Sequence, residues 1–266
     1  MKRMTITVLL AVLLLTGCGP RMEPSDNVQG GNDNNIVQVT DNEVKGSGTI
    51  DPVSEPGEVR GFLQDHQIAN GDIYLKDGLL YINLVKPTEN GEKLLADRYK
   101  SGTYKTVRVT HSIEELQAAQ DKLGDQDLFS RLNLYSTSID VIKNKITISM
   151  PDSSEAEAKP EIEKLIDPNL IEYDIQKLSE TPDVVGTISK IDNESHRILV
   201  LEEGKTEPSY WFSFNDHSEM VDSTGGSVTF DDLKEKGKVR VWINGAVMDS
   251  FPGQAGTRRL ELVTSN

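Results

Sequence analysis

The residue types that most often carry catalysis or bind metals are scattered along this chain. Its four histidines fall in different segments, and no two of them have the HxH or HxxxH spacing of metal ligands. They are His66, His111, His196 and His217. Serines are plentiful, but no Gly-x-Ser-x-Gly elbow occurs. We therefore predict no catalytic residue, no metal site and no cofactor, and we expect that the protein is not an enzyme.

Carboxylates are clustered at two places in the sequence. Each cluster could be either a functional site or the start of a helix. Four glutamates lie between residues 155 and 163, where negative charge suits the entrance of a solvated helix. Asp231 and Asp232, with Asp222 before them, could hold a cation, but a capped short helix explains them better. Neither group predicts a catalytic centre.

Two segments of the last third are stronger candidates for binding. In YWFSF (residues 210–214) the side chains alternate, so we expect residues 210, 212 and 214 in a core and Trp211 on the accessible face. In SFPGQ (residues 250–254) the proline fixes φ and the glycine permits a positive φ, which is turn chemistry. The sharper alternative is a binding loop. The candidate ligand-binding residues are Trp211, Phe251 and Gln254.

The only cysteine follows an apolar run at the start of the chain. Lys2 and Arg3 precede about ten mostly apolar residues, the length of a signal-peptide core rather than of a membrane span. The next residues, LTGC (15–18), resemble the lipobox of bacterial lipoproteins. The resemblance implies that residues 1–17 are removed and that Cys18 is diacylated. The implied location is the extracytoplasmic face of the cell membrane, with palmitate-type chains as the lipid anchor.

Composition limits the partners of such a chain. Removal of residues 1–17 takes away two cations and changes the formal side-chain charge from −15 to −17. Such a chain is a poor partner for nucleic acid, whose phosphates require clustered lysine and arginine. Residues 18–56 are rich in Gly, Asn, Asp, Ser and Pro, which predicts a flexible linker spanning roughly 35 Å. We expect the membrane, through diacylglyceryl-Cys18, and a protein or cell-envelope component as partners.

Residues 57–180 predict a first folded domain. Residues 72–75 and 79–85 read as a hairpin around Asp77-Gly78. Strand 104–110 is followed by a helix that Ser112 and Glu115 begin as a capping box. A strand pair (138–142 and 145–150), a helix at 161–166 started by Pro160, and strand 170–175 complete the order β-α-β-β-α-β. We predict a ferredoxin-like split βαβ sandwich of four strands with an added hairpin, and no internal repeat.

Part of this domain resembles the propeptides of secreted serine proteases. The similarity spans residues 107–174 and centres on the hairpin I-D-V-x-x-N-x-I-x-I at residues 139–148. It implies a module that inhibits an exported protease or helps it to fold, rather than a catalyst.

Residues 183–266 predict a second, all-β domain. Five short strands are expected at 184–191, 197–202, 210–214, 238–243 and 259–263, with turns at Asp192-Asn193 and Asn244-Gly245. This number and length of strands favour a small closed barrel of the OB type, so the chain is of the α+β class. The segments VGTI (185–188), VRVWING (239–245) and DSFPGQA (249–255) resemble a small domain of unknown function in lipoproteins of Gram-positive bacteria.

We therefore expect a membrane-anchored extracytoplasmic lipoprotein that acts as a non-enzymatic binding or interaction module. The alternatives are an inhibitor or folding partner of an exported protease, and a hydrolase whose site is assembled from scattered residues.

Overall fold

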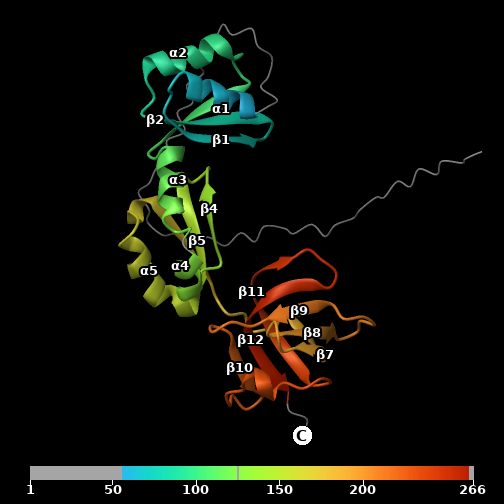
Figure 1. Cartoon of the computed structure of the whole chain (residues 1–266). Helices are drawn as coiled ribbons and strands as arrows, with labels where there is room; N and C mark the ends of the chain where they lie inside the picture. Colours follow the sequence, from blue (N-terminus) through green and yellow to red (C-terminus); the bar gives the residue numbers. More distant parts are fainter. Residues whose placement is uncertain (1–55, 125, 264–266) are drawn as a thin grey trace, which may run out of the picture. The chain divides into compact units, whose positions relative to one another are not determined.

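The computed structural model describes residues 56–124 and 126–263 (Figure 1). The predicted leader, Cys18 and the predicted linker up to residue 55 lie outside these ranges. The described chain is a mixed α+β protein with three separate sheets and three hydrophobic cores. Within these ranges no helix has the length and apolar character needed to cross a membrane.

The first unit has the element order α-β-β-α-β. Its elements are α1 (Pro56–Asp65), β1 (Asn70–Lys76), β2 (Leu79–Val85), α2 (Glu89–Arg98) and β3 (Tyr104–Val109). Strand β2 pairs antiparallel with β1 and parallel with β3. Both helices lie over one face of this sheet (Figure 1), where they form a core with it.

Local signals account for most of this unit. The predicted β1–β2 hairpin is confirmed, and Asp77 and Gly78 take the positive φ values that its turn needs. Helix α1 was not predicted; it packs through Val59 and Leu63, which are four residues apart and fully buried.

The second unit repeats the same order with one extra helix. Its elements are α3 (Ile113–Asp121), α4 (Gln126–Arg131), β4 (Ser136–Asp140), β5 (Lys145–Pro151), α5 (Glu155–Glu163) and β6 (Ile171–Gln176). Strand β5 pairs antiparallel with β4 and parallel with β6, and the helices share one core with this sheet. Helix α5 begins at Glu155, preceded by a 3-10 turn. Pro160 therefore lies inside the helix, and the predicted start at Pro160 is wrong.

The two α-β-β-α-β units contradict both the four-stranded ferredoxin-like sheet and the predicted lack of a repeat. Strand β3 pairs with β2, to which helix α2 connects it in parallel, and not with the strands that follow it. Two tandem copies of α-β-β-α-β necessarily contain β-α-β-β-α-β across their junction, which explains the misreading. The repeat is preserved as buried positions: Leu80, Ile82 and Leu84 of β2 correspond to Ile146, Ile148 and Met150 of β5.

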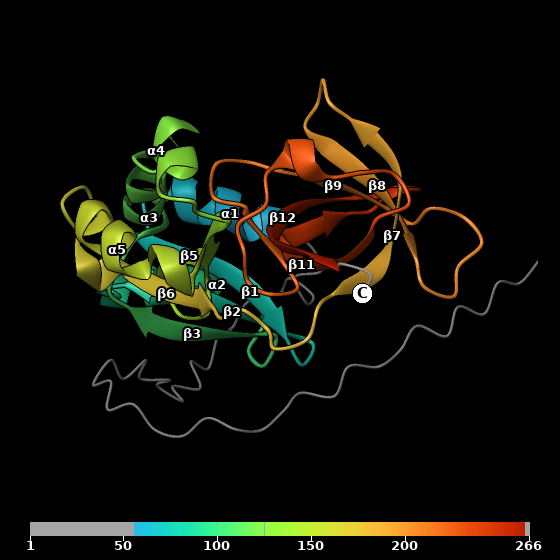
Figure 2. The same cartoon turned by 90° about the horizontal axis from the view of Figure 1, so that it is seen from below.

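The C-terminal domain is all β apart from one 3-10 turn. Its elements are β7 (Val184–Asp192), β8 (Arg197–Glu202), β9 (Tyr210–Ser213), β10 (Glu219–Asp222), η3 (Phe230–Asp232), β11 (Lys238–Met248) and β12 (Gly253–Val263). Strand pairing runs β10-β12-β11-β7-β8-β9, and β12 also pairs with β9. Figure 2 shows β7, β8, β9, β11 and β12 from a second side. The pairings therefore form a closed circuit of five strands, with β10 added outside it.

Two details of this domain differ from the prediction. Strand β10 was not predicted. Asn244-Gly245 is not a turn between strands but an irregularity inside β11, where Gly245 has a φ of +68° and the register with β12 shifts. Strands β11 and β12 continue past it as a long hairpin and turn at residues 249–252.

Candidate functional site

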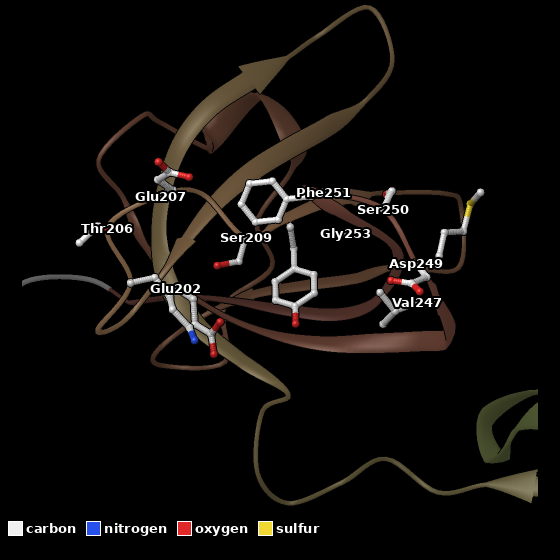
Figure 3. Close-up of a pocket in the computed structure, with 12 residues that line it drawn as sticks. Glu202, Thr206, Glu207, Ser209, Val247, Asp249, Ser250, Phe251 and Gly253 are labelled. Carbon is white, nitrogen blue, oxygen red and sulfur yellow. The ribbon is translucent and has the colours of Figure 1, made fainter. Parts of the chain in front are cut away.

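A pocket of about 670 Å³ opens beside the turn of the β11–β12 hairpin (Figure 3). One wall is the connection from β8 to β9, residues 203–209, with Glu202 before it and Tyr210 after it. The other wall is residues 247–251 together with Gly253. The volume lies within the range of small-ligand sites in proteins.

Hydrogen bonds fix the turn that forms the second wall. The Ser250 hydroxyl donates to the carbonyl of Pro252 (2.8 Å) and accepts from the Gln254 amide (3.4 Å). The Gly253 N–H donates to the carbonyl of Ser209 at 2.9 Å, which ties the turn to the opposite wall. A backbone hydrogen bond therefore joins the two walls of the pocket.

The glycine of this turn serves a purpose that its sequence did not indicate. Gly253 does not have a positive φ, so conformational freedom does not explain it. A Cβ at this position would lie 2.8 Å from Cδ1 of Tyr210, closer than real Cβ contacts allow. Gly253 lets strand β12 pass directly over the Tyr210 ring.

The pocket rim is unusually apolar for a solvent-exposed turn. Six large hydrophobic side chains are exposed in the described ranges, and three of them lie between residues 247 and 251. They are Val247, Met248 and Phe251, which are 43%, 66% and 80% exposed. Figure 3 shows the Phe251 ring between Glu207 and Ser209 on one side and Val247 and Asp249 on the other. A group of exposed apolar side chains at a pocket is typical of a binding surface.

The structure places the three predicted binding residues close together but in different settings. Of the three, only Phe251 lines the pocket. Trp211 of β9 is the register partner of Gln254 in β12, and Gln254 in turn contacts the turn through Ser250. The predicted alternation of residues 210–214 is confirmed: Phe212 is fully buried, whereas Trp211 is partly exposed on the other face.

Trp211 already has a partner within the domain. The Arg197 guanidinium lies 4.4 Å from the centre of the Trp211 ring. Arg197 also donates from Nε to Asp192 at 2.9 Å. This hydrogen bond, together with one from the Ser195 N–H, lowers the pKa of Asp192 below its ordinary value. Part of the Trp211 surface therefore packs against the protein.

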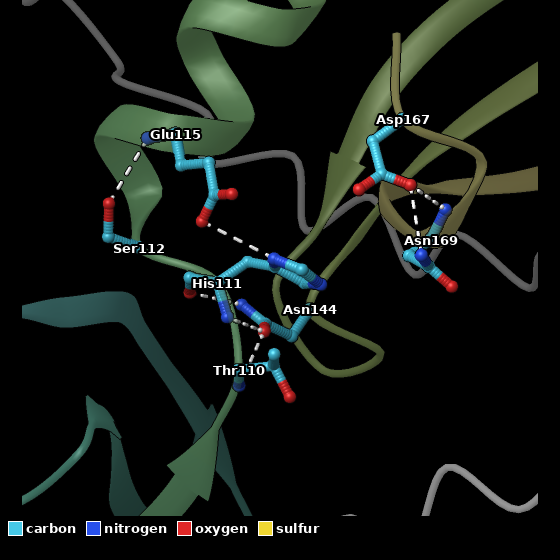
Figure 4. Close-up of polar contacts among 7 residues, drawn as sticks. All are labelled: Thr110, His111, Ser112, Glu115, Asn144, Asp167 and Asn169. Carbon is cyan, nitrogen blue, oxygen red and sulfur yellow. Dashed lines mark hydrogen bonds and ion pairs between the residues drawn. The ribbon is translucent and has the colours of Figure 1, made fainter. Parts of the chain in front are cut away.

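The histidines are not gathered into one site. His111 precedes helix α3, and its Nδ1 lies 3.3 Å from the carboxylate of Glu115 (Figure 4). The Ser112 hydroxyl accepts the N–H of Glu115 at 3.1 Å and caps this helix, which confirms one half of the predicted capping box. The Glu115 carboxylate contacts His111 instead of returning to the Ser112 N–H. His66 contacts the ring and carbonyl of Phe62. Each of these two histidines contacts a residue four positions away in the chain, so the contacts stabilise local structure.

A buried amide in this region, the asparagine of the I-D-V-x-x-N-x-I-x-I hairpin, makes three hydrogen bonds to the backbone. Asn144 is 4% exposed, and its Oδ1 accepts from the N–H groups of Thr110 (3.2 Å) and His111 (2.9 Å). Its Nδ2 donates to the carbonyl of His111 at 2.9 Å (Figure 4). Asn144 thus satisfies the backbone between β3 and α3, which is a structural role. In the same way Asp167 caps a 3-10 turn by accepting from Asn169 (Figure 4).

The aspartates considered as a cation site belong to capped turns. Asp232 accepts from the N–H and hydroxyl of Thr229 in a capping box, so the predicted short capped helix is confirmed. Asp222 accepts from Thr224 and from the N–H of Gly226, and these bonds lower the pKa of Asp222. In residues 56–124 and 126–263 no group of three or more His, Cys, Asp or Glu side chains could hold a metal ion.

Sequence reasoning missed most of the pocket. Glu202, Glu207 and Asp249 were not predicted as binding residues, and neither were the exposed Val247 and Met248. A signal was present in residues 246–251, AVMDSF, where apolar side chains continue into a segment that ends in turn residues. No sequence pattern indicated that residues 203–209 form a wall of the pocket, because their position depends on the pairing of β9 with β12.

Comparison with protein families finds a match for the C-terminal part of the chain. The profile of the family described as "Protein of unknown function (DUF3221)" matches residues 185–264. The resemblance of the C-terminal third to a small domain of unknown function is thereby confirmed, and the pocket lies entirely within the matched residues. A comparison with curated proteins finds no match.

Proposed function

We propose that the protein is a membrane-anchored extracytoplasmic lipoprotein whose C-terminal domain is a non-enzymatic binding module. The observation that carries the binding function is the exposed apolar rim of Val247, Met248 and Phe251 on a pocket with hydrogen-bonded walls. Solvent exposure of these side chains is unfavourable, and a ligand that covers them removes that cost.

The strand order supports an OB-like barrel as the scaffold of this module. Strands β7, β8, β9, β12 and β11 pair in a closed circuit, β9 and β12 run parallel, and η3 lies between β9 and β11. Barrels of this type bind ligands on strand faces and in loops at the barrel ends. The negative charge of the chain argues against nucleic acid as the ligand.

The membrane anchor is tested at Cys18. We expect the wild-type chain to incorporate labelled palmitate and to sediment with membranes, and we expect Cys18→Ser to lose the label and remain in the supernatant. The two acyl chains account for this difference, because durable membrane anchoring needs two lipid signals. Equal palmitate labelling of the wild-type protein and the Cys18→Ser variant would contradict the proposed lipid anchor.

Phe251 is the residue through which the binding function is tested. Phe251→Ala should leave the free energy of unfolding within about 0.5 kcal/mol of wild type, since an exposed ring contributes little to packing. A photoreactive phenylalanine analogue at position 251 should cross-link to an envelope component in intact cells. The same analogue at Leu75, which is 58% exposed in the first unit, is the matched control. The proposal would be contradicted if no cross-linked product formed at position 251, or if the same products formed in equal amounts at positions 251 and 75.

Inhibition of an exported protease remains a second candidate. What supports it is the arrangement of residues 139–148 as a hairpin with a helix and a parallel strand behind it, the order that the propeptide resemblance implies. Micromolar full chain should then slow secreted serine proteases. Unchanged rates would eliminate this candidate.

A further inference from the structure

The pocket beside the β11–β12 turn carries an excess of unpaired negative charge. Its charged residues are three carboxylates, Glu202, Glu207 and Asp249, and one cation, Lys205. Among the described residues none of these carboxylates has a hydrogen-bond or ion-pair partner in the protein. The pocket therefore presents acceptors that the fold itself does not use.

These acceptors lie next to apolar side chains rather than apart from them. Asp249 is between Met248 and Phe251 in the chain, and Glu207 and Asp249 line the same pocket as these two apolar side chains. A complementary ligand must bring a positive group and an apolar group within one residue or two of each other. Small inorganic cations lack the apolar part. Anionic lipid and nucleic acid have the wrong charge.

We propose that this pocket binds an extended peptide segment in which lysine or arginine stands beside an apolar side chain. The inference rests on the proposed binding function and gives its ligand a chemical class. The apolar side chain covers Phe251 and Met248, and the cation meets Glu207, Glu202 or Asp249. The net charge of the whole chain, −15, adds a long-range attraction that increases the association rate of a basic segment.

The test uses the full chain and probes of defined charge. Fluorescent octapeptides share alternate phenylalanine and leucine positions and carry lysine, serine or glutamate at the remaining positions. A neutral N-acetylglucosamine tetramer and phosphatidylcholine vesicles serve as probes of other classes. We expect the lysine peptide to bind at least about tenfold more tightly than the serine peptide, and the glutamate peptide not to bind.

Two triple variants separate the pocket from general attraction to an acidic protein. The pocket variant is Glu202→Gln, Glu207→Gln and Asp249→Asn. The control variant, Glu194→Gln, Asp231→Asn and Glu235→Gln, changes the charge equally at exposed positions of the same domain that do not line the pocket. The pocket variant should weaken the lysine peptide about tenfold, and the control variant less than about twofold. Tryptophan fluorescence confirms that both variants are folded.

The outcomes distinguish this inference from the proposed function. Equal weakening by both variants would overturn the inference, because the attraction would then be general. If the serine peptide bound as tightly as the lysine peptide, or if the glycan or the vesicles bound, and Phe251→Ala abolished that binding, the inference would also be overturned, while the binding function would stand. If no probe binds and position 251 gives no cross-link in cells, both fail.

Discussion

Gly186→Ala is expected to lower the free energy of unfolding of the C-terminal domain by about 3 kcal/mol, the upper end of overpacking effects. A Cβ at Gly186 would overlap the carbonyl oxygen of Leu201 and would lie 2.7 Å from a methyl group of Val200. The nearest atom belongs to the backbone, so no side-chain rotation relieves the contact. Strand β8 would have to move away from β7.

This contact arises because Gly186 is paired on both sides. Its register partners are Glu202 in β8 and Val239 in β11, so it lies within the closed circuit of strands. A shift of β8 therefore disturbs the pairing of β9 as well. The resulting loss is spread over the whole barrel.

Urea denaturation followed by tryptophan fluorescence measures this effect in the full chain. Both tryptophans, Trp211 and Trp242, lie in the C-terminal domain, so the signal reports that domain alone. Gly256→Ala is the matched control, because the nearest atom to its Cβ would be Cβ of Asn244 at 3.4 Å, an ordinary contact. It should change the free energy of unfolding by less than about 0.5 kcal/mol. Equal effects of the two variants would show that the barrel accommodates the methyl group.

Asn144→Ala is expected to destabilise the second α-β-β-α-β unit by about 3 kcal/mol, because it leaves three partly buried backbone groups without partners and places alanine at a positive φ. The N–H groups of Thr110 and His111 and the carbonyl of His111 all lose their bond to this side chain. Asn144 also has a φ of +55°, which alanine adopts at a cost of roughly 1–2 kcal/mol.

Asn144→Gly separates the two causes. Glycine accepts the positive φ but makes none of the three hydrogen bonds, so it should recover about 1 kcal/mol of the loss in the alanine variant. Urea unfolding followed by circular dichroism gives the stability, and amide hydrogen exchange of Thr110 and His111 reports the lost bonds directly. Unchanged exchange at both amides would contradict the assigned role. The tryptophan-detected transition is the internal control.

Features that depend on neighbouring residues could be predicted from the sequence. The cap at Ser112, the turn at Asp77-Gly78 and the alternation around Phe212 each depend on contacts within four residues or on one strand period. Such contacts are formed by the same residues whatever the remaining chain does.

The pairing of strands could not be predicted in this way. Strand β3 has the same alternating pattern whether it lies beside β2 or beside a strand of the next unit. Backbone hydrogen bonds between strands are made by groups that every residue carries, so the pattern of side chains does not identify the partner. The prediction consequently placed β3 in the wrong sheet and missed the repeat.

By itself, the sequence determined that the chain is α+β, that its last third is a small β domain of a family of unknown function, and that Phe251 lies in a turn, whereas Gln254, also predicted in that turn, lies in strand β12. Only the tertiary structure decided that the connection 203–209 faces residues 247–251 and forms a pocket with them. The physical reason is the parallel pairing of β9 with β12. That pairing joins segments about forty residues apart and depends on closure of the whole circuit of strands.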